Sequence, residues 1–183
     1  TITRAAATVR FPARCMLIAS MNPCPCGYLG HPQQSCVCAA SAIERYRARL
    51  SGPVLDRIDL HVDVPAVRYD DLHAESTAES SAVIRQRVMA ARQRQLARFA
   101  GHEQVRCNAH MDSRLVRHIC RPLPPPAEGM LRAALERLGL SARAHDRILK
   151  VARTIADLAG ADNLSAEHVA EAVQYRGLDR PVV

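Results

Sequence analysis

With 183 residues, 48% of them hydrophobic, the chain is large and apolar enough for a packed core, yet no apolar run is long enough to cross a bilayer. It opens without a signal-peptide pattern, so we expect a protein of the cytoplasm, and its 3% aromatic content disfavours domains that stack single-stranded bases. The net charge of +7 is almost all arginine, with Lys150 as the single lysine; this suits phosphate ligands, and a GC-rich genome would produce the same bias.

Residues 1–68 have the pattern of an α/β domain. Residues 3–11 alternate loosely and predict a strand or hairpin arm that Pro12 ends. The run at 15–21 is apolar on both faces, which is typical of a strand buried inside a parallel sheet. Residues 60–64 alternate and predict a shorter strand. We therefore expect this part to be the end of a sheet-containing domain.

One helix is expected within this α/β part. Ser41 can cap its first turn, with Glu44 three residues later completing a capping box. The helix should run to about Leu50, where Ser-Gly-Pro at 51–53 ends it.

From residue 69 to 183 the hydrophobic period becomes helical. We expect helices at 79–99, 113–119, 127–138, 141–159 and 165–175. The first should turn Ile84, Val88 and Ala91 inward, and Arg87, Arg94 and Arg98 outward. The helix at 141–159 has a well-marked apolar stripe of Ala144, Ile148, Val151, Ile155 and Leu158. Ser165, followed by His168, should begin the last helix.

Four of the seven cysteines form two close pairs, Cys24 with Cys26 and Cys36 with Cys38. Four thiolates are the ligand set of a closed structural zinc site, although Cys-x-Cys spacing is less specific than Cys-x-x-Cys. His31 lies between the pairs and could replace one thiol. Four ordinary reduced cysteines are the alternative. No carboxylate or base accompanies the cluster, so a catalytic metal site is not expected.

Three polar residues are candidates for binding a ligand. Asn22 follows the predicted strand at 15–21, where open α/β sheets bind ligands, but it is also a simple turn residue before a proline. Arg57 lies between acidic neighbours, which alone indicates a surface ion pair. Arg143 lies in the first turn of a helix, where a cation opposes the helix dipole, so either an anionic ligand or plain solvent exposure explains it.

The sequence has no loop of its own to hold a triphosphate. No Gly-x-x-x-x-Gly-Lys-Ser/Thr motif is present, and Lys150 lies inside a predicted helix. No apolar run ends in an Asp-Glu pair that could hold magnesium. We therefore expect that the chain does not bind ATP unaided.

Several segments carry a family resemblance: FPAR at 11–14, MNPCPCG at 21–27, YRARLSGPVLDRIDL at 46–60, LSARAHDRIL at 140–149 and RTIADL at 153–158. They resemble the ComM/YifB group of magnesium-chelatase-like AAA+ ATPases over nearly the whole chain. The resemblance implies the C-terminal part of an AAA+ P-loop-type core in residues 1–68, followed by an all-α lid domain in residues 69–183.

The resemblance also implies roles and partners. Asn22 would be the sensor-1 residue beside the γ-phosphate, Arg57 the arginine finger that reaches a neighbouring subunit's ATP, and Arg143 the sensor-2 residue of the lid. ATP with Mg²⁺ would be bound by the complete protein, in a hexameric ring of identical subunits. The best-known members drive DNA branch migration in recombination and natural transformation, which the arginine-rich helix at 79–99 suits. The alternatives are a chelatase-type motor for magnesium insertion into porphyrin and a zinc-stabilised binding module without activity.

Overall fold

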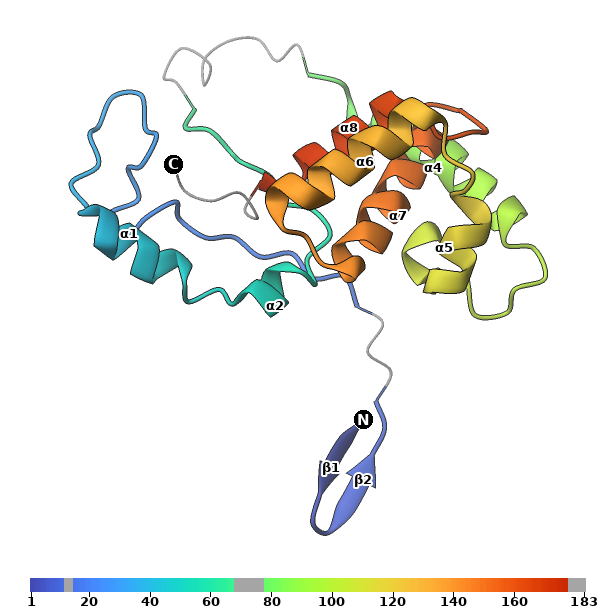
Figure 1. Cartoon of the computed structure of the whole chain (residues 1–183), viewed down its shortest axis with the longest axis horizontal. Coiled ribbons are helices and arrows are strands. Elements are labelled where there is room, and N and C mark those ends of the chain that lie inside the picture. Colours follow the sequence, from blue (N-terminus) through green and yellow to red (C-terminus); the bar gives the residue numbers. More distant parts are fainter. Residues whose placement is uncertain (12–14, 68–77, 178–183) are drawn as a thin grey trace. The chain divides into compact units, whose positions relative to one another are not determined.

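The structure is a computed structural model that describes residues 1–11, 15–67 and 78–177 (Figure 1). Two compact units divide the chain, Thr1–Arg47 and Ala48–Val183. The domain boundary predicted between residues 68 and 69 lies outside the described residues. Among the residues that are described, no helix has both the length and the apolar character needed to cross a membrane.

The first unit contains a hairpin and one helix. Strands β1 (Ile2–Arg4) and β2 (Ala7–Val9) pair antiparallel, with Ile2 opposite Val9, so the strand or hairpin arm predicted over residues 3–11 is a hairpin. Helix α1 (Ala40–Arg47) buries Ile43. It begins one residue before Ser41, so the predicted capping box is wrong. The backbone carbonyl of Ala39 accepts the first hydrogen bonds instead, from the N–H groups of the third and fourth residues after it.

Two predicted strands do not form. Residues 15–21 have no regular structure, and the side chains of Met16, Leu17 and Ile18 are 86%, 77% and 83% exposed. Residues 60–64 are also irregular. A strand is held by hydrogen bonds to a neighbouring strand, and within the described ranges only β1 and β2 pair in this way. The described part of the chain is therefore mostly helical, with one small two-stranded sheet.

The second unit is a helical domain. Its helices are α2 (Gly52–Leu55), α4 (Ser81–Arg98), the 3₁₀ turn η1 (Asn108–His110), α5 (Ser113–Ile119), α6 (Pro125–Leu138), α7 (Ala142–Leu158) and α8 (Ala166–Gln174). Side chains cap four of them, from Ser80, Asp112, Ser141 and Ser165. The five helices predicted in this region are confirmed, including the Ser165–His168 pair that begins α8. α6 begins earlier than predicted because proline fits the first helical turn.

Helix α7 is the centre of the hydrophobic core. α4, α5, α8 and η1 pack against it, and α6 packs against α8. The buried core residues are Phe99, Met111, Val116, Cys120, Leu123, Ala127, Leu131, Ile148, Leu149, Ala152, Ala156, Leu164, Val169 and Ala172. The unit thus has one continuous core that α7 organises.

The predicted apolar stripe of α7 is right in part. Ala144 and Ile148 are buried as expected, but Leu158 is 39% exposed, and the buried face extends instead over Leu149 and Ala152. Because α7 has neighbours on more than one side, its buried surface is wider than a single stripe.

The predicted inner face of α4 is also only partly buried. Ala91 is 3% exposed, whereas Ile84 and Val88 are 41% and 44% exposed. The buried residues of α4 are Ala91 and Gln95, so its C-terminal half makes the contact with the core.

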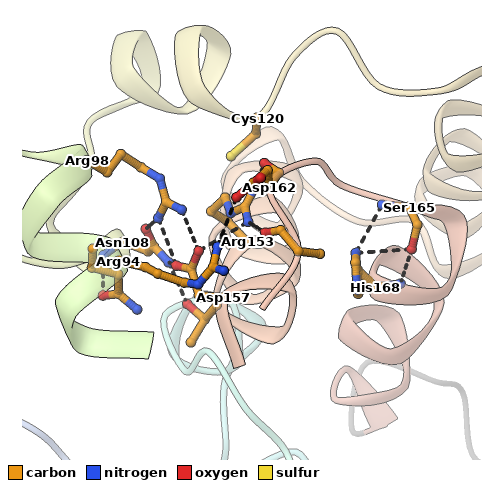
Figure 2. Close-up of polar contacts among 12 residues, drawn as sticks. Arg94, Arg98, Asn108, Cys120, Arg153, Asp157, Asp162, Ser165 and His168 are labelled. Carbon is orange, nitrogen blue, oxygen red and sulfur yellow. Dashed lines mark hydrogen bonds and ion pairs between the residues drawn. The ribbon is translucent and has the colours of Figure 1, made fainter. Parts of the chain in front are cut away.

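A buried carboxylate joins α4 to α7 (Figure 2). The side chain of Asp157 is fully buried and pairs with Arg98 of α4 and, at 3.1 Å, with Arg153 one turn earlier in α7. It also accepts a hydrogen bond of 2.8 Å from the amide of Asn108. Arg98 was expected to point outward; this prediction is wrong because the acid at Asp157 draws its guanidinium inward. Burial raises the pKa of Asp157, but the hydrogen bonds from Arg98 and Asn108 outweigh burial and lower it.

We predict that Asp157→Asn lowers the free energy of unfolding by about 3–5 kcal/mol, because two arginines then lose their buried counter-charge. Urea unfolding at neutral pH measures this loss. Asp162→Asn is the matched control, since it breaks the pair with Arg94 where the carboxylate side chain is 90% exposed, and it should change stability far less. Equal effects of the two substitutions would contradict the buried role of Asp157.

The lowered pKa of Asp157 also predicts a pH dependence. Its contribution to stability should be fully present above the unfolded-state pKa of about 3.9, and it should be lost as the pH falls through the lower pKa of the folded state. Urea unfolding from pH 6 down to pH 3 should therefore show a steeper loss in the native protein than in Asp157→Asn. Parallel curves would show that this carboxylate titrates normally.

Candidate functional site

A tight turn after α2 presents Arg57. The N–H of Arg57 donates to the carbonyl of Val54 at 2.9 Å, and that of Ile58 to Leu55 at 3.0 Å. The side chain of Arg57 is exposed, and its guanidinium donates to the carbonyl of Pro53 one turn earlier. The sequence suggested that Arg57 pairs with its acidic neighbours, but these carboxylates have other partners, so Arg57 keeps its charge available to an external anion.

The residues around Arg57, which we call the Arg57 loop (residues 56–61), lie against α7 and α8. Asp56 accepts a hydrogen bond of 2.9 Å from the hydroxyl of Ser141, the N-cap of α7. Arg176, just after α8, donates to the carbonyl of Ile58 at 2.6 Å and lies 3.7 Å from the carboxylate of Asp56. The loop is thus attached to the ends of two helices.

Further contacts hold the second half of the Arg57 loop. The carboxylate of Asp59 forms an ion pair with Arg147, one turn into α7. The N–H of His61 donates to the carbonyl of Tyr175 at 2.8 Å. The segment predicted as a strand at 60–64 is thus held by a hydrogen bond to the residue after α8, and not by a neighbouring strand.

Arg143 lies in the first turn of α7, two residues after the N-cap Ser141. Its side chain is exposed, and no ion pair or hydrogen bond joins it to another described residue. Because Ser141 donates to Asp56, the structure brings Arg57 and Arg143 onto adjoining segments. Two arginines far apart in sequence are therefore carried by segments that contact each other in the second unit.

Asn22 lies in the first unit, at the start of the cysteine-containing loop. Its side chain is exposed, and a turn follows in which the N–H of Gly27 donates to the carbonyl of Cys24 at 3.1 Å. Gly27 has a φ of +85°, which favours glycine, and a Cβ placed there would lie 3.9 Å from the amide of Asn22. The turn at residues 24–27 thus brings Gly27 close to the side-chain amide of Asn22.

The four clustered cysteines converge. The sulfur atoms of Cys24, Cys26, Cys36 and Cys38 all lie within 4.8 Å of one another. Three pairs of sulfur atoms among the first three are 3.4, 3.6 and 3.6 Å apart. Four sulfurs placed tetrahedrally at the usual Zn–S bond length are about 3.8 Å apart, so these thiols have the separation of a closed zinc site.

The thiols of the cluster differ in acidity. Hydrogen bonds with the backbone of Tyr28 and Val37 lower the pKa of Cys26 to about 6. A backbone hydrogen bond at Cys38 lowers the pKa of Cys36, but burial and the neighbouring thiols outweigh it and raise that pKa to about 12. Thiolates this close repel one another, and a bound cation removes that penalty.

His31 is not part of the cluster. Its Nδ1 accepts hydrogen bonds of 3.1 Å from the backbone N–H groups of Gln33 and Gln34. Among the described residues, the group whose side chains could together hold a metal ion consists of the four cysteines. The structure thus favours the four-thiol set over the alternative with histidine.

The residues that hold the Arg57 loop were not predicted from the sequence. Ser141, Arg147 and Arg176 were not singled out, because each contact spans a long stretch of chain and no local pattern reports it. The one local indication of these contacts was that two carboxylates, Asp56 and Asp59, flank Arg57. Such a pair suggests that cationic side chains from elsewhere in the chain lie nearby.

Two family comparisons cover most of the chain. Residues 1–72 match the family described as Magnesium chelatase, subunit ChlI, and residues 78–176 match Magnesium chelatase, subunit ChlI C-terminal.

Individual relatives agree. The chain is 42% identical to the uncharacterized protein YifB of Escherichia coli over its whole length, and 42% identical to the competence protein ComM of Haemophilus influenzae over 98% of its length. A relative from Mycobacterium tuberculosis, the uncharacterized protein Rv2897c, is 41% identical over 91% of the chain. The chain spans only 35%, 34% and 32% of the lengths of these three proteins. With both family matches and relatives of this similarity, the chain belongs to the ComM/YifB family of magnesium-chelatase-like AAA+ proteins.

Proposed function

We propose that this chain supplies the lid and the sensing residues of an ATP-driven ring motor. Family membership supports an ATPase, and the chain has no phosphate-binding loop of its own. The triphosphate and its Mg²⁺ are then held by polypeptide outside this sequence. The exposed apolar run at 15–21 fits this proposal, because it becomes a buried strand once the rest of an AAA+ sheet covers it.

In this motor three residues act on the nucleotide. Asn22 orients the attacking water beside the γ-phosphate, Arg143 contacts the phosphates of its own subunit from the lid, and Arg57 reaches the ATP of the neighbouring subunit in a hexameric ring. Arginine suits both positions because its guanidinium binds phosphate oxygens bidentately and stays charged. The observation that carries the proposal is that Arg57 and Arg143 are exposed, have no carboxylate partner among the described residues, and lie on adjoining segments.

We expect Arg57→Ala in the complete protein to lower kcat for ATP hydrolysis by roughly 10³-fold or more, the scale for removal of an arginine finger. Nucleotide affinity should change little, because the finger acts on the neighbour's ATP. Steady-state hydrolysis and binding of a fluorescent ATP analogue measure the two effects. Arg117→Ala, which removes an exposed arginine of α5, is the control and should hydrolyse ATP normally. Normal turnover by Arg57→Ala would overturn the finger role.

We propose DNA as the substrate of the motor, in branch migration during recombination or natural transformation. The name of the competence protein ComM supports a task in DNA uptake. On α4, Arg85 and Arg92 are two turns apart and exposed, and neither has a partner within the described residues. The other arginines of α4 are engaged: Arg87 pairs with Glu79, and the remaining two pair with aspartates.

We expect DNA to stimulate ATP hydrolysis, and the double variant Arg85→Gln, Arg92→Gln to weaken DNA binding with a shallower salt dependence, since it removes phosphate contacts. Arg132→Gln with Arg137→Gln removes the same charge from the exposed side of α6 and is the matched control. If no DNA stimulates hydrolysis, the DNA proposal is wrong, and the alternative, a chelatase-type motor for magnesium insertion into porphyrin, is favoured by the family description Magnesium chelatase.

We propose that the four cysteines bind a structural Zn²⁺. The supporting observation is the convergence of four sulfur atoms from two chain segments. Zinc would supply positive charge that keeps all four thiols ionised and would tie together the two ends of the loop that follows Asn22. With four protein ligands the site has no open position, so its contribution is to folding. A zinc-stabilised binding module without ATPase activity is the alternative for the chain.

We expect purified protein to contain about one zinc per chain and to lose it in Cys24→Ser and Cys36→Ser. Elemental analysis measures the metal, and the spectrum of the Co²⁺-substituted protein reports tetrahedral thiolate ligands. Cys15→Ser is the matched control, because Cys15 is exposed and outside the cluster. A well-folded protein without metal would rule the site out.

A further inference from the structure

The contacts that hold the Arg57 loop form a connected set, which we call the lid clamp: Asp56, Asp59, Ser141, Arg147 and Arg176. Asp56 and Asp59 belong to the Arg57 loop. Ser141 is the N-cap of α7, Arg147 lies in α7, and Arg176 follows α8. The nucleotide contacts proposed above use none of these five side chains. Their arrangement therefore needs its own explanation.

Arg176 is the buried part of the lid clamp. It is 1% exposed, and its guanidinium donates to the carbonyl of Ile58. A buried guanidinium is costly unless it is paired and hydrogen-bonded, so Arg176 cannot leave the loop without a large penalty. Its backbone N–H donates to Val173 at the end of α8, which fixes the point from which it reaches.

Asp56 joins the two helix ends. Its carboxylate accepts from Ser141, whose oxygen also caps α7 by accepting from the N–H of Ala144 at 3.3 Å. The same carboxylate faces Arg176. An acid at a helix N-terminus interacts favourably with the helix dipole. Asp56 is thus placed between the start of α7 and the end of α8, directly before Arg57.

The pair of Asp59 with Arg147 adds a second attachment one turn further along α7. The Arg57 loop is therefore held on both sides of Arg57, at Asp56 and at Asp59. Arg143 lies between Ser141 and Arg147 on α7. The loop that carries Arg57 is therefore attached to the same turns of α7 that carry Arg143.

We propose, resting on the function proposed above, that the lid clamp is a positioning device that makes Arg57 move together with the lid. When Arg143 engages the phosphates of its own subunit, the lid takes a defined position, and the lid clamp carries Arg57 to a matching position at the neighbouring ATP. Asp56, Asp59, Arg147 and Arg176 are thus positioning residues that couple adjacent sites. Neither α7 nor the loop needs to change shape for this, because the two move as one packed body.

The first test measures whether the lid clamp holds the loop. In this chain, hydrogen exchange of the His61 amide, which donates to Tyr175, should speed up at least several-fold in Asp59→Arg, where like charges replace the ion pair. The double variant Asp59→Arg, Arg147→Asp restores opposite charges and should recover protection. Asp162→Arg makes the same charge change at the exposed pair with Arg94 and should leave this amide unaffected. Unchanged exchange in Asp59→Arg would overturn the proposal.

The second test measures coupling in the complete ATPase. Asp56→Asn and Asp59→Arg should lower kcat by roughly 10- to 100-fold, the scale for an ångström-sized misplacement of a catalytic group. The KM for ATP and the affinity for nucleotide should stay within about twofold, because Arg143 is untouched. The Hill coefficient for ATP should fall towards one, and the charge-swapped double variant should recover both values. A merely structural role would instead change KM, nucleotide affinity and stability together with kcat.

The motor proposal and the lid-clamp proposal are overturned by different outcomes. If Arg57→Ala hydrolyses ATP normally, the finger role is wrong and the coupling proposal falls with it. If Arg57→Ala is inactive while Asp56→Asn and Asp59→Arg keep the native kcat and cooperativity, the motor proposal stands and the lid clamp is overturned. Loss of kcat and cooperativity with rescue in the swap supports both.

Discussion

The packing of the second unit depends on the carboxylate of Asp157. This fully buried acid draws in Arg98 from α4 and Arg153 from within α7, and Arg153 in turn donates to carbonyls in the loop beyond the end of α7. Without the negative charge, two guanidinium groups would meet in the interior with no counter-charge. One residue thus fixes both the position of α4 and the path of the chain towards α8.

The other end of α7 uses the same chemistry for another purpose. There Asp56 and Asp59 come from outside the helix and are held by Ser141, Arg147 and Arg176. Arginines with carboxylate partners therefore build the scaffold at both ends of the helix. Arg57 and Arg143, which are exposed and have no such partner among the described residues, keep a free charge. A guanidinium that must bind phosphate gains from this, because it has no existing ion pair to break.

The sequence predicted the helices well because their signals are local: a cap such as Ser165 indicates where a helix starts, and the apolar periodicity indicates how far it extends. It failed where the determining partner is distant. Arg98 looked like a surface residue because Asp157 is far away in sequence, and the run at 15–21 looked like a buried strand although no described strand covers it. The cysteine cluster was predictable from spacing alone, whereas the preference for four thiols over His31 required the positions of the side chains.

Under the proposed function, Asn22, Arg57 and Arg143 must meet triphosphates that this chain does not hold by itself. Bringing separate groups to one reacting centre costs conformational entropy unless each is positioned beforehand. The chain reduces that cost locally at both places. In the first unit a glycine turn and four converging thiols follow Asn22 directly. In the second unit, the lid clamp binds the Arg57 loop to the helix that carries Arg143. Each subunit then has two prepared pieces to place instead of three independent side chains, and this is the physical reason to expect catalysis to depend on residues that never touch the nucleotide.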